Sequence, residues 1–258
     1  MFHSPLSPLL SPILAFFLAS APTPQAPPDN AAPAQAASEA TAAPSKAEAA
    51  APESAQETKP AAEQAAPAAG AEKLSGERGD AVRTRHTTTV DGRELAYSAT
   101  AGRMKLTDEA GKAKAELFYV AYVLDGVSDP AQRPITFAFN GGPGSSSVWL
   151  HLGAFGPRRV RMAAEGWAPP PPYELIDNAH SLLDVTDLVF IDPVTTGYSR
   201  AAEGESAAQF HGVTPDVEWV AEFIRLYTTR ELRWPSPKFL AGESYGTTRA
   251  AALAGHLQ

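Results

Sequence analysis

Short runs of apolar and β-branched residues, separated by turn residues, recur along the last three quarters of the chain. The first two, 87–90 and 93–100, flank Asp91-Gly92, a dipeptide that favours a tight turn between antiparallel strands. Another short strand is expected over 102–108 and a longer one over 115–124. We expect these strands to form the antiparallel leading edge of a larger sheet.

Three apolar runs have the length and composition of buried strands: 135–139, 187–192 and 239–242. Between the second and third runs, apolar residues recur at helical spacing over 215–227, with Thr214 as the expected N-cap and Pro215 at the first helical position. An alanine-rich helical pattern over 249–257 follows the third run. This order predicts an α/β fold whose central sheet is mostly parallel.

The N-terminal part of the chain lacks this pattern. Residues 1–21 hold a short apolar run followed by Ala19-Ser20-Ala21, as in a secretory signal peptide, although an uncleaved anchor or a misplaced start codon are alternatives. Residues 22–75 are rich in alanine, proline and acidic residues, which predicts a disordered linker that is either an envelope tether or inert filler. We therefore expect an exported protein, periplasmic or secreted, whose folded domain occupies 76–258.

Composition narrows the classes of function. The 258 residues carry a formal net charge of −8 and no basic cluster, so nucleic acid is not an expected partner. The sequence contains no cysteine, which excludes disulfides, thiol catalysis and thiolate metal sites. We expect neither a metal nor a cofactor, and the oligomeric state stays open.

The stretch Gly242-Glu243-Ser244-Tyr245-Gly246 lies between an expected strand and an expected helix. In that setting G-x-S-x-G is the nucleophile elbow, a turn so tight that glycines must flank the serine. The turn exposes the hydroxyl of Ser244 at a helix N-terminus, where developing negative charge is stabilised.

A glycine-rich loop, 140–147, follows the buried run 135–139. Without side chains in the way, its backbone N–H groups can approach a ligand, and an α/β-hydrolase takes one oxyanion-hole N–H from such a loop. A phosphate-binding loop is the alternative, but neither G-x-G-x-x-G nor a Gly-Lys-Ser/Thr ending is present.

From about residue 80 to its last residue, the chain resembles the serine carboxypeptidases of the α/β-hydrolase fold. The matching blocks are Asn140-Gly141-Gly142-Pro143-Gly144, Gly156-Pro157, Asn178 through Asp192, Gly197-Tyr198-Ser199 and Gly242-Glu243-Ser244-Tyr245-Gly246. Two further stretches, Tyr97 to Gly102 and Trp149 to Gly153, look most like the bacterial branch of the family.

The resemblance implies a role for each matched residue. Ser244 would attack the scissile carbonyl, and the backbone N–H groups of Gly142 and Tyr245 would form the oxyanion hole. The side chains of Asn140 and Glu243, with the backbone of Gly141, would hold the C-terminal carboxylate of a peptide. A glutamic acid can do so only when protonated, which implies an acidic working pH.

Some positions depart from the family pattern. Ala138 replaces a tryptophan, Ser145 a cysteine, Ala154 the carboxylate partner of Glu243, and Thr195 a glycine. The missing tryptophan and carboxylate weaken the implied recognition of a free carboxylate.

The triad order of this fold is Ser, then Asp or Glu, then His. No acid follows Ser244, and the only later histidine, His256, would lie about 18 Å away along a helix. The earlier histidines match no triad position: His86, His151, His180 and His211. We therefore expect a C-terminally truncated fragment of the domain, without the triad Asp and His.

The expected function is that of a serine-type carboxypeptidase, which acts on peptides or proteins with a free C-terminus through an acyl-enzyme on Ser244. This chain alone would be nearly inactive. Two alternatives stay open: a serine esterase or acyltransferase of the same fold, motivated by Ala138 and Ala154, and a catalytically inactive binding module.

Overall fold

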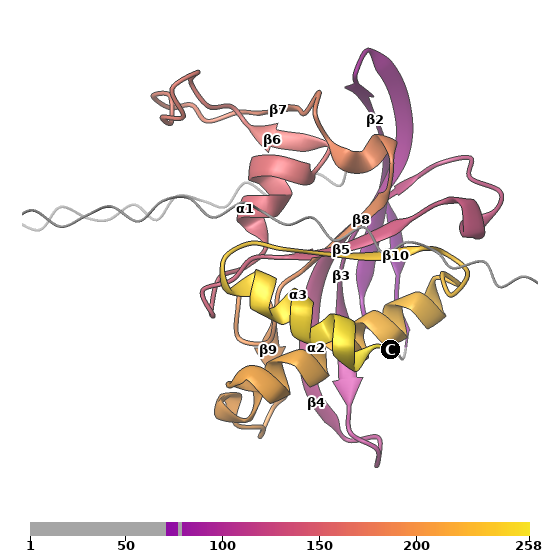
Figure 1. The fold of residues 1–258 in the computed structure, drawn as a ribbon, viewed down its shortest axis with the longest axis vertical. Helices are drawn as coiled ribbons and strands as arrows, with labels where there is room; N and C mark the ends of the chain where they lie inside the picture. Colours follow the sequence, from indigo (N-terminus) through magenta and orange to yellow (C-terminus); the bar gives the residue numbers. More distant parts are fainter. Residues whose placement is uncertain (1–70, 77–78) are drawn as a thin grey trace, which may run out of the picture. The chain divides into compact units, whose positions relative to one another are not determined.

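The computed structural model describes residues 71–76 and 79–258 (Figure 1). The chain divides into two units, Met1–Ala61 and Ala62–Gln258, and all described residues belong to the second. The expected signal peptide, 1–21, and most of the expected linker, 22–75, lie outside the described residues. Strand β1, Glu72–Leu74, falls within the range expected as linker and pairs with β2, so the sheet begins earlier than predicted.

A mixed sheet of eight strands forms the centre of the second unit, in the order β1-β2-β3-β4-β8-β5-β10, with β9 paired to β4 (Figure 1). Beyond β1, its strands are β2 (Ala81–Val90), β3 (Arg93–Thr107), β4 (Ala113–Leu124), β5 (Ile135–Phe139), β8 (Asp187–Ile191), β9 (Arg200–Ala201) and β10 (Lys238–Gly242). Strands β1 to β4 are antiparallel, whereas β8, β5 and β10 are parallel to one another. The predicted α/β fold, with antiparallel leading strands and a parallel centre, is confirmed.

The predicted hairpin is confirmed, since Asp91 and Gly92 connect β2 to β3 with φ values of 46° and 75°. The separate short strand predicted over 102–108 is wrong, because β3 continues without a break to Thr107. Gly102 does not interrupt the strand. It allows a close approach instead, because a Cβ there would lie 2.6 Å from the Cβ of Ala81.

Two helices pack on one face of the sheet: α2 (Val213–Arg230) and α3 (Tyr245–His256) (Figure 1). The prediction of Thr214 as N-cap is wrong, because α2 begins after Gly212. Gly212 has φ 106°, which a glycine adopts far more readily than a threonine, and its carbonyl accepts the N–H of Asp216. Pro215 still lies in the first turn, where no N–H is needed.

The opposite face carries a smaller core around Ala138, Leu188 and Phe190. The short helix α1 (Val148–Leu150) and the π-helical turn η2 (His151–Phe155) contribute to it, and a hairpin of β6 (Arg158–Val160) and β7 (Leu175–Asp177) packs against η2. Three short 3₁₀ turns complete the elements: η1 (Pro130–Gln132), η3 (Leu182–Asp184) and η4 (Ala207–Phe210).

A buried ionic cluster lies where β8 begins. The carboxylate of Asp187 accepts Nε of Arg133 at 3.0 Å, a guanidinium N–H of Arg233 and the backbone N–H of Leu124 at 3.0 Å. Asp187 is 1 % exposed, so these donors replace the water that a buried carboxylate loses.

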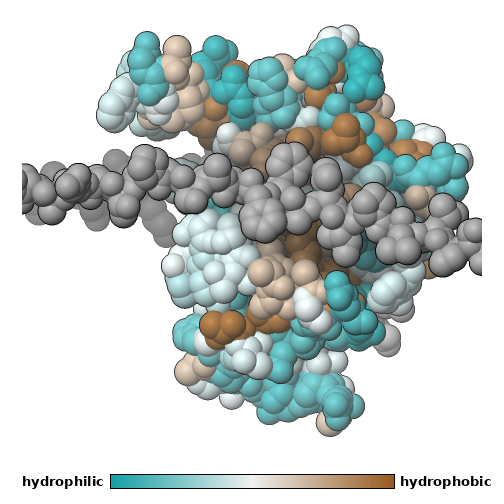
Figure 2. Space-filling model, in the orientation of Figure 1, coloured by the Kyte–Doolittle hydropathy of each residue, from teal (hydrophilic) through white to brown (hydrophobic). Residues whose placement is uncertain are grey.

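Polar residues dominate the lower half of the face seen in Figure 2, where hydrophobic residues show as isolated spots. Within 71–76 and 79–258, no helix is both long enough and apolar enough to cross a membrane.

Candidate active site

Ser244 occupies the turn between β10 and α3. Its φ of 55° and ψ of −126° lie in a region that residues with a Cβ rarely adopt, and its side chain is exposed. The carbonyl of Ser244 accepts two hydrogen bonds from Thr247, one from its backbone N–H at 2.9 Å and one from its side-chain hydroxyl at 2.7 Å. These bonds close the first turn of α3.

The glycines on either side of Ser244 are required by packing. A Cβ at Gly242 would lie 2.0 Å from the carbonyl oxygen of Gly246, and a Cβ at Gly246 would lie 2.6 Å from the carbonyl oxygen of Phe139. Both distances are too short for any side chain. The geometry is therefore that of a nucleophile elbow packed directly on the end of β5.

The glycine-rich loop after β5 lies against this elbow. A Cβ at Gly141 would meet the backbone nitrogen of Tyr245 at 2.4 Å, and Gly142 has φ 107°. In the described part of the chain, no protein group accepts the N–H of Gly141, Gly142 or Tyr245. Three free backbone donors therefore lie at the contact between loop and elbow.

Asn140 joins the two segments through its side chain and is fully buried. Its Nδ2 donates to Oε2 of Glu243 at 3.0 Å, and its Oδ1 accepts the N–H of Leu150 at 3.0 Å. An amide held at both ends has a fixed orientation. All six predicted site residues thus lie in two touching segments: Asn140, Gly141, Gly142, Glu243, Ser244 and Tyr245.

Asp192 connects the glycine-rich loop to the loop that follows β8. Its carboxylate accepts the backbone N–H of Ser147 at 2.9 Å and that of Tyr198 at 3.4 Å. Burial raises the pKa of Asp192, and these two N–H groups oppose the rise. A Cβ at Gly197 would overlap this carboxylate, at 1.8 Å from its Oδ2. The sequence motif contained Asp192 and Gly197 but did not reveal this contact.

Thr195 replaces the glycine expected in the same loop, and it has φ 72°. A β-branched residue is strained in this region, whereas a glycine is not. Its Oγ1 lies 3.1 Å from Nε2 of His211. The departure from the family pattern therefore falls at a position where the backbone itself favours glycine.

Two residues that sequence reasoning missed lie behind the elbow. Arg249 is 2 % exposed, and its Nε donates to Oδ2 of Asp216 at 2.8 Å while its Nη1 donates to the carbonyl of Asn140 at 2.8 Å. In the sequence Arg249 is one residue of an alanine-rich helix with no acid nearby. Only the packing of α2 against α3 brings its partner to it.

A cavity of about 490 Å³ opens beside these residues. Its walls include Gly144 of the glycine-rich loop, Thr195, Asp216 at the start of α2, and Tyr245 with Arg249 of α3. Ser244 does not line it, so the cavity lies on the Tyr245 side of the elbow. Its walls come from four segments that are separate in sequence: the glycine-rich loop, the loop after β8, the start of α2, and α3.

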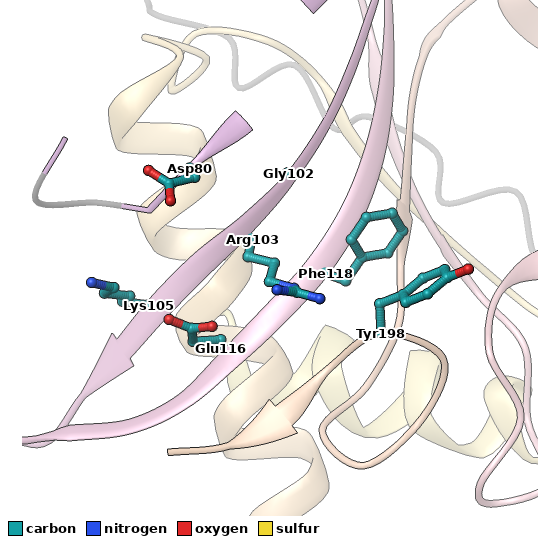
Figure 3. A pocket seen from close by; sticks show the side chains of 7 residues that line it. All are labelled: Asp80, Gly102, Arg103, Lys105, Glu116, Phe118 and Tyr198. Carbon is teal, nitrogen blue, oxygen red and sulfur yellow. The ribbon is translucent and has the colours of Figure 1, made fainter. Parts of the chain in front are cut away.

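A second hollow of about 350 Å³ lies on the outer face of β3 and β4. Figure 3 shows the side chains that line it, which include the charged Asp80, Arg103, Lys105 and Glu116 and the rings of Phe118 and Tyr198. The two acids balance the two bases, and no predicted site residue is among its walls. We therefore take the cavity beside the elbow as the candidate site.

No histidine of the described residues hydrogen-bonds the hydroxyl of Ser244. His256 lies at the far end of α3, and His211 bonds Thr195. Half-buried His151 contacts the hydroxyl of Tyr122 at 2.6 Å, and desolvation by the surrounding protein lowers its pKa to about 4. The part of the chain that the structure describes also holds no group of three or more acidic or histidine side chains suited to a metal ion.

Comparisons with known proteins agree on one family. A family model described as serine carboxypeptidase matches residues 93–257. Serine carboxypeptidase-like 10 of Arabidopsis thaliana is 28% identical over 142 residues, covering 54% of this chain and 30% of that protein. Serine carboxypeptidase-like 46 of the same plant is 30% identical over 145 residues, covering 52% and 27%.

Among solved structures, Kex1(delta)p, a prohormone-processing carboxypeptidase from Saccharomyces cerevisiae, aligns with a TM-score of 0.49 and 24% identity, over 62% of this chain and 33% of that chain. The chain thus spans about a third or less of the relatives it matches. The expected likeness to a bacterial branch stays a prediction.

Proposed function

The chain belongs to the serine carboxypeptidase family, and we propose that Ser244 is the nucleophile with which the protein removes the last residue of a peptide. The observation that carries the proposal is the contact between elbow and loop, where Gly141 lies against the backbone nitrogen of Tyr245. An exposed serine on a positive-φ turn, next to free backbone donors, suits nucleophilic attack on a carbonyl.

In the proposed reaction, Oγ of Ser244 loses its proton to a base and bonds to the carbonyl carbon of the last peptide bond. The oxygen that becomes negative accepts the N–H groups of Gly142 and Tyr245, each worth about 3–4 kcal/mol in the transition state. The C–N bond then breaks, and the protonated amine leaves as the terminal amino acid. Water hydrolyses the acyl-enzyme and frees Ser244. No residue of this chain is assigned as the base.

The terminal carboxylate of the substrate would bind at Asn140, Gly141 and Glu243. Asn140 is fixed by its bonds to Glu243 and Leu150, so its second Nδ2 hydrogen is directed in advance. Two carboxyl groups that meet at one site are expected to share a proton. Ala154 offers Glu243 no side-chain partner, and its carbonyl accepts Nδ2 of Asn178 at 2.7 Å.

The test compares cleavage of one peptide bond in a blocked dipeptide and in its C-terminal amide, using the full-length protein. The wild type should cleave the free acid faster, and Ser244→Ala should abolish cleavage of both. A Ser244→Ala variant that keeps the wild-type rate would refute the nucleophile. Equal rates on acid and amide would favour an esterase or acyltransferase of the same fold, which the missing partner at Ala154 supports.

We also propose that the protein is exported, on the basis of the signal-peptide pattern in residues 1–21. N-terminal sequencing of the mature protein should give a start after Ala21. Recovery of intact Met1 from the exported fraction would contradict cleavage there.

A further inference from the structure

Arg249 is the largest fully buried side chain among the described residues, and it carries a charge. Its guanidinium lies 5.1 Å from the ring centre of Tyr245 and 5.3 Å from that of Phe139. Burying a charge is costly unless it is paired and fully hydrogen-bonded. Here the partners are Asp216 and the carbonyl of Asn140, each at 2.8 Å.

The carbonyl that Arg249 binds belongs to the same peptide group as the N–H of Gly141. A charged donor at the oxygen of a peptide draws electron density from its nitrogen and makes the N–H a stronger donor. It also fixes the plane of the peptide, and hence the direction of that N–H. The N–H of Gly141 has no acceptor in the described part of the chain.

We propose that Arg249 is a positioning residue that determines the preference for a free terminal carboxylate. Acting through the Asn140–Gly141 peptide, it strengthens and aims the N–H of Gly141 at that carboxylate. The inference rests on the proposed function, because it takes Gly141 as part of the carboxylate site.

Asp216 has the opposite effect on the same preference. Its carboxylate is 12% exposed, lines the cavity and neutralises Arg249. Replacing it with asparagine leaves the guanidinium charge uncompensated and removes a negative charge near the substrate carboxylate. Arg249 and Asp216 therefore form one ion pair whose two halves affect substrate preference in opposite directions. An ion pair that only held the fold together would show no such opposition.

Arg233 supplies a matched control. It is also buried, at 7% exposure, and it pairs with Asp187 at the start of β8. Arg233 does not line the cavity and makes no hydrogen bond to the elbow. Arg233→Met therefore removes a similar buried ion pair without touching the Asn140–Gly141 peptide.

The experiment measures kcat/KM for one peptide bond in a blocked dipeptide and in its C-terminal amide, with the full-length protein. Arg249→Met should lower the acid-to-amide ratio about tenfold, the effect of weakening one hydrogen bond to a charged group. Asp216→Asn should raise the ratio, and Arg233→Met should leave it at the wild-type value.

Arg249→Lys is included in case Arg249→Met does not fold. A lysine keeps the charge but cannot hold both partners in the fork geometry of arginine, so the ratio should fall here too. For each folded variant, the amide proton of Gly141 is followed by NMR and should move upfield when the bond to the Asn140 carbonyl is lost.

The outcomes separate the two claims. If the wild type prefers the acid and the Arg249 variants keep that preference, the inference is wrong and the proposed function stands. An unmoved Gly141 proton in a folded Arg249 variant would also refute the inference. If the wild type shows no preference, the proposed carboxylate recognition fails, and the inference fails with it.

Discussion

At the scale of single residues, Ser244 and Thr195 both hold a backbone conformation that their side chains disfavour, with φ values of 55° and 72°. The strain at Ser244 belongs to a motif that the sequence already indicated. The strain at Thr195 became visible only with the backbone angles, although the family pattern had a glycine there. A third residue, His151, is half-buried with a lowered pKa, so its contribution to the free energy of unfolding depends on pH.

Thr195→Gly should raise the free energy of unfolding by about 1 kcal/mol, because glycine adopts the left-handed region without steric cost. The loss of the contact between Oγ1 and His211 subtracts little, since that contact is exposed. Chemical denaturation measures the change. Thr195→Ala is the control, because it loses the hydroxyl but keeps the Cβ. Equal stability of the two variants would show that the backbone angle is not the cause.

His151 should make the protein less stable in acid. Its pKa is about 4 in the folded state and about 6.5 in a free chain, so the unfolded state binds the extra proton between these values. The contribution of neutral His151 to the free energy of unfolding is fully present above pH 6.5, and it falls by about 3 kcal/mol as the pH drops to 4. When the free energy of unfolding is measured by denaturation at several pH values in this range, it should therefore change less steeply with pH for His151→Gln. The control is His180→Gln, at an exposed histidine. If the free energy of unfolding changed equally steeply with pH in both variants, His151 would not be the cause of the acid sensitivity.

At the scale of elements, α3 follows Ser244 and contains two glycines with opposite surroundings. Gly246 touches the carbonyl of Phe139, whereas a Cβ at Gly255 would meet nothing within 4 Å. The same helix therefore contains one glycine that packing requires and one that it does not.

Gly246→Ala should destabilise the protein by several kcal/mol, because α3 must move away from β5 to admit the methyl group. Gly255→Ala should instead stabilise it by up to about 1 kcal/mol, the usual difference between the two residues inside a helix. Thermal unfolding of both variants tests this pair. A similar gain in stability for both variants would show that helix propensity, and not the contact with β5, governs α3.

Sequence patterns predicted the two long helices and most of the strands because those strands are runs of apolar or β-branched residues bounded by turn residues. They failed where a tertiary contact decides the outcome. Gly102 looked like a break but lies against Ala81, and the helix predicted to start at Thr214 starts after Gly212 instead. The two turns that hold the six candidate residues could be predicted because their glycine spacing is local in the sequence, whereas the roles of these residues follow from the family resemblance and stay predictions. The pairing of Arg249 with Asp216 could not be, because thirty-three positions separate them and neither has a local partner.

At the scale of the whole folded unit, the sheet carries different chemistry at its two ends. Asn140 and Ser244 follow the carboxyl ends of β5 and β10, where open α/β sheets place their sites. At the other end, where β8 begins, Asp187 joins Arg133 and Arg233. One end offers free backbone donors, while at the other end the buried charges of Asp187, Arg133 and Arg233 are paired with one another.

Asp187→Asn should lower the free energy of unfolding by about 3–5 kcal/mol, because it leaves two buried arginines without their counter-charge. Equilibrium denaturation gives the value. Glu174→Gln is the matched control, since it breaks the exposed pair with Arg161 and should change stability by less than about 1 kcal/mol. A loss below that size for Asp187→Asn would show that water or other groups compensate the arginines.

The contacts at Gly141, Gly242 and Gly246 bear on how the family's sequence signature persists in evolution. At each position a Cβ would overlap backbone, so selection for a folded protein alone preserves the glycine. The fold gains nothing from a strained serine at position 244, so under the proposed function only selection for turnover preserves Ser244. A lineage that lost catalysis would therefore keep the glycines of G-x-S-x-G but could replace the serine at its centre. Among distant homologues, the central residue of G-x-S-x-G should therefore indicate which proteins still hydrolyse peptides, whereas the two glycines should not.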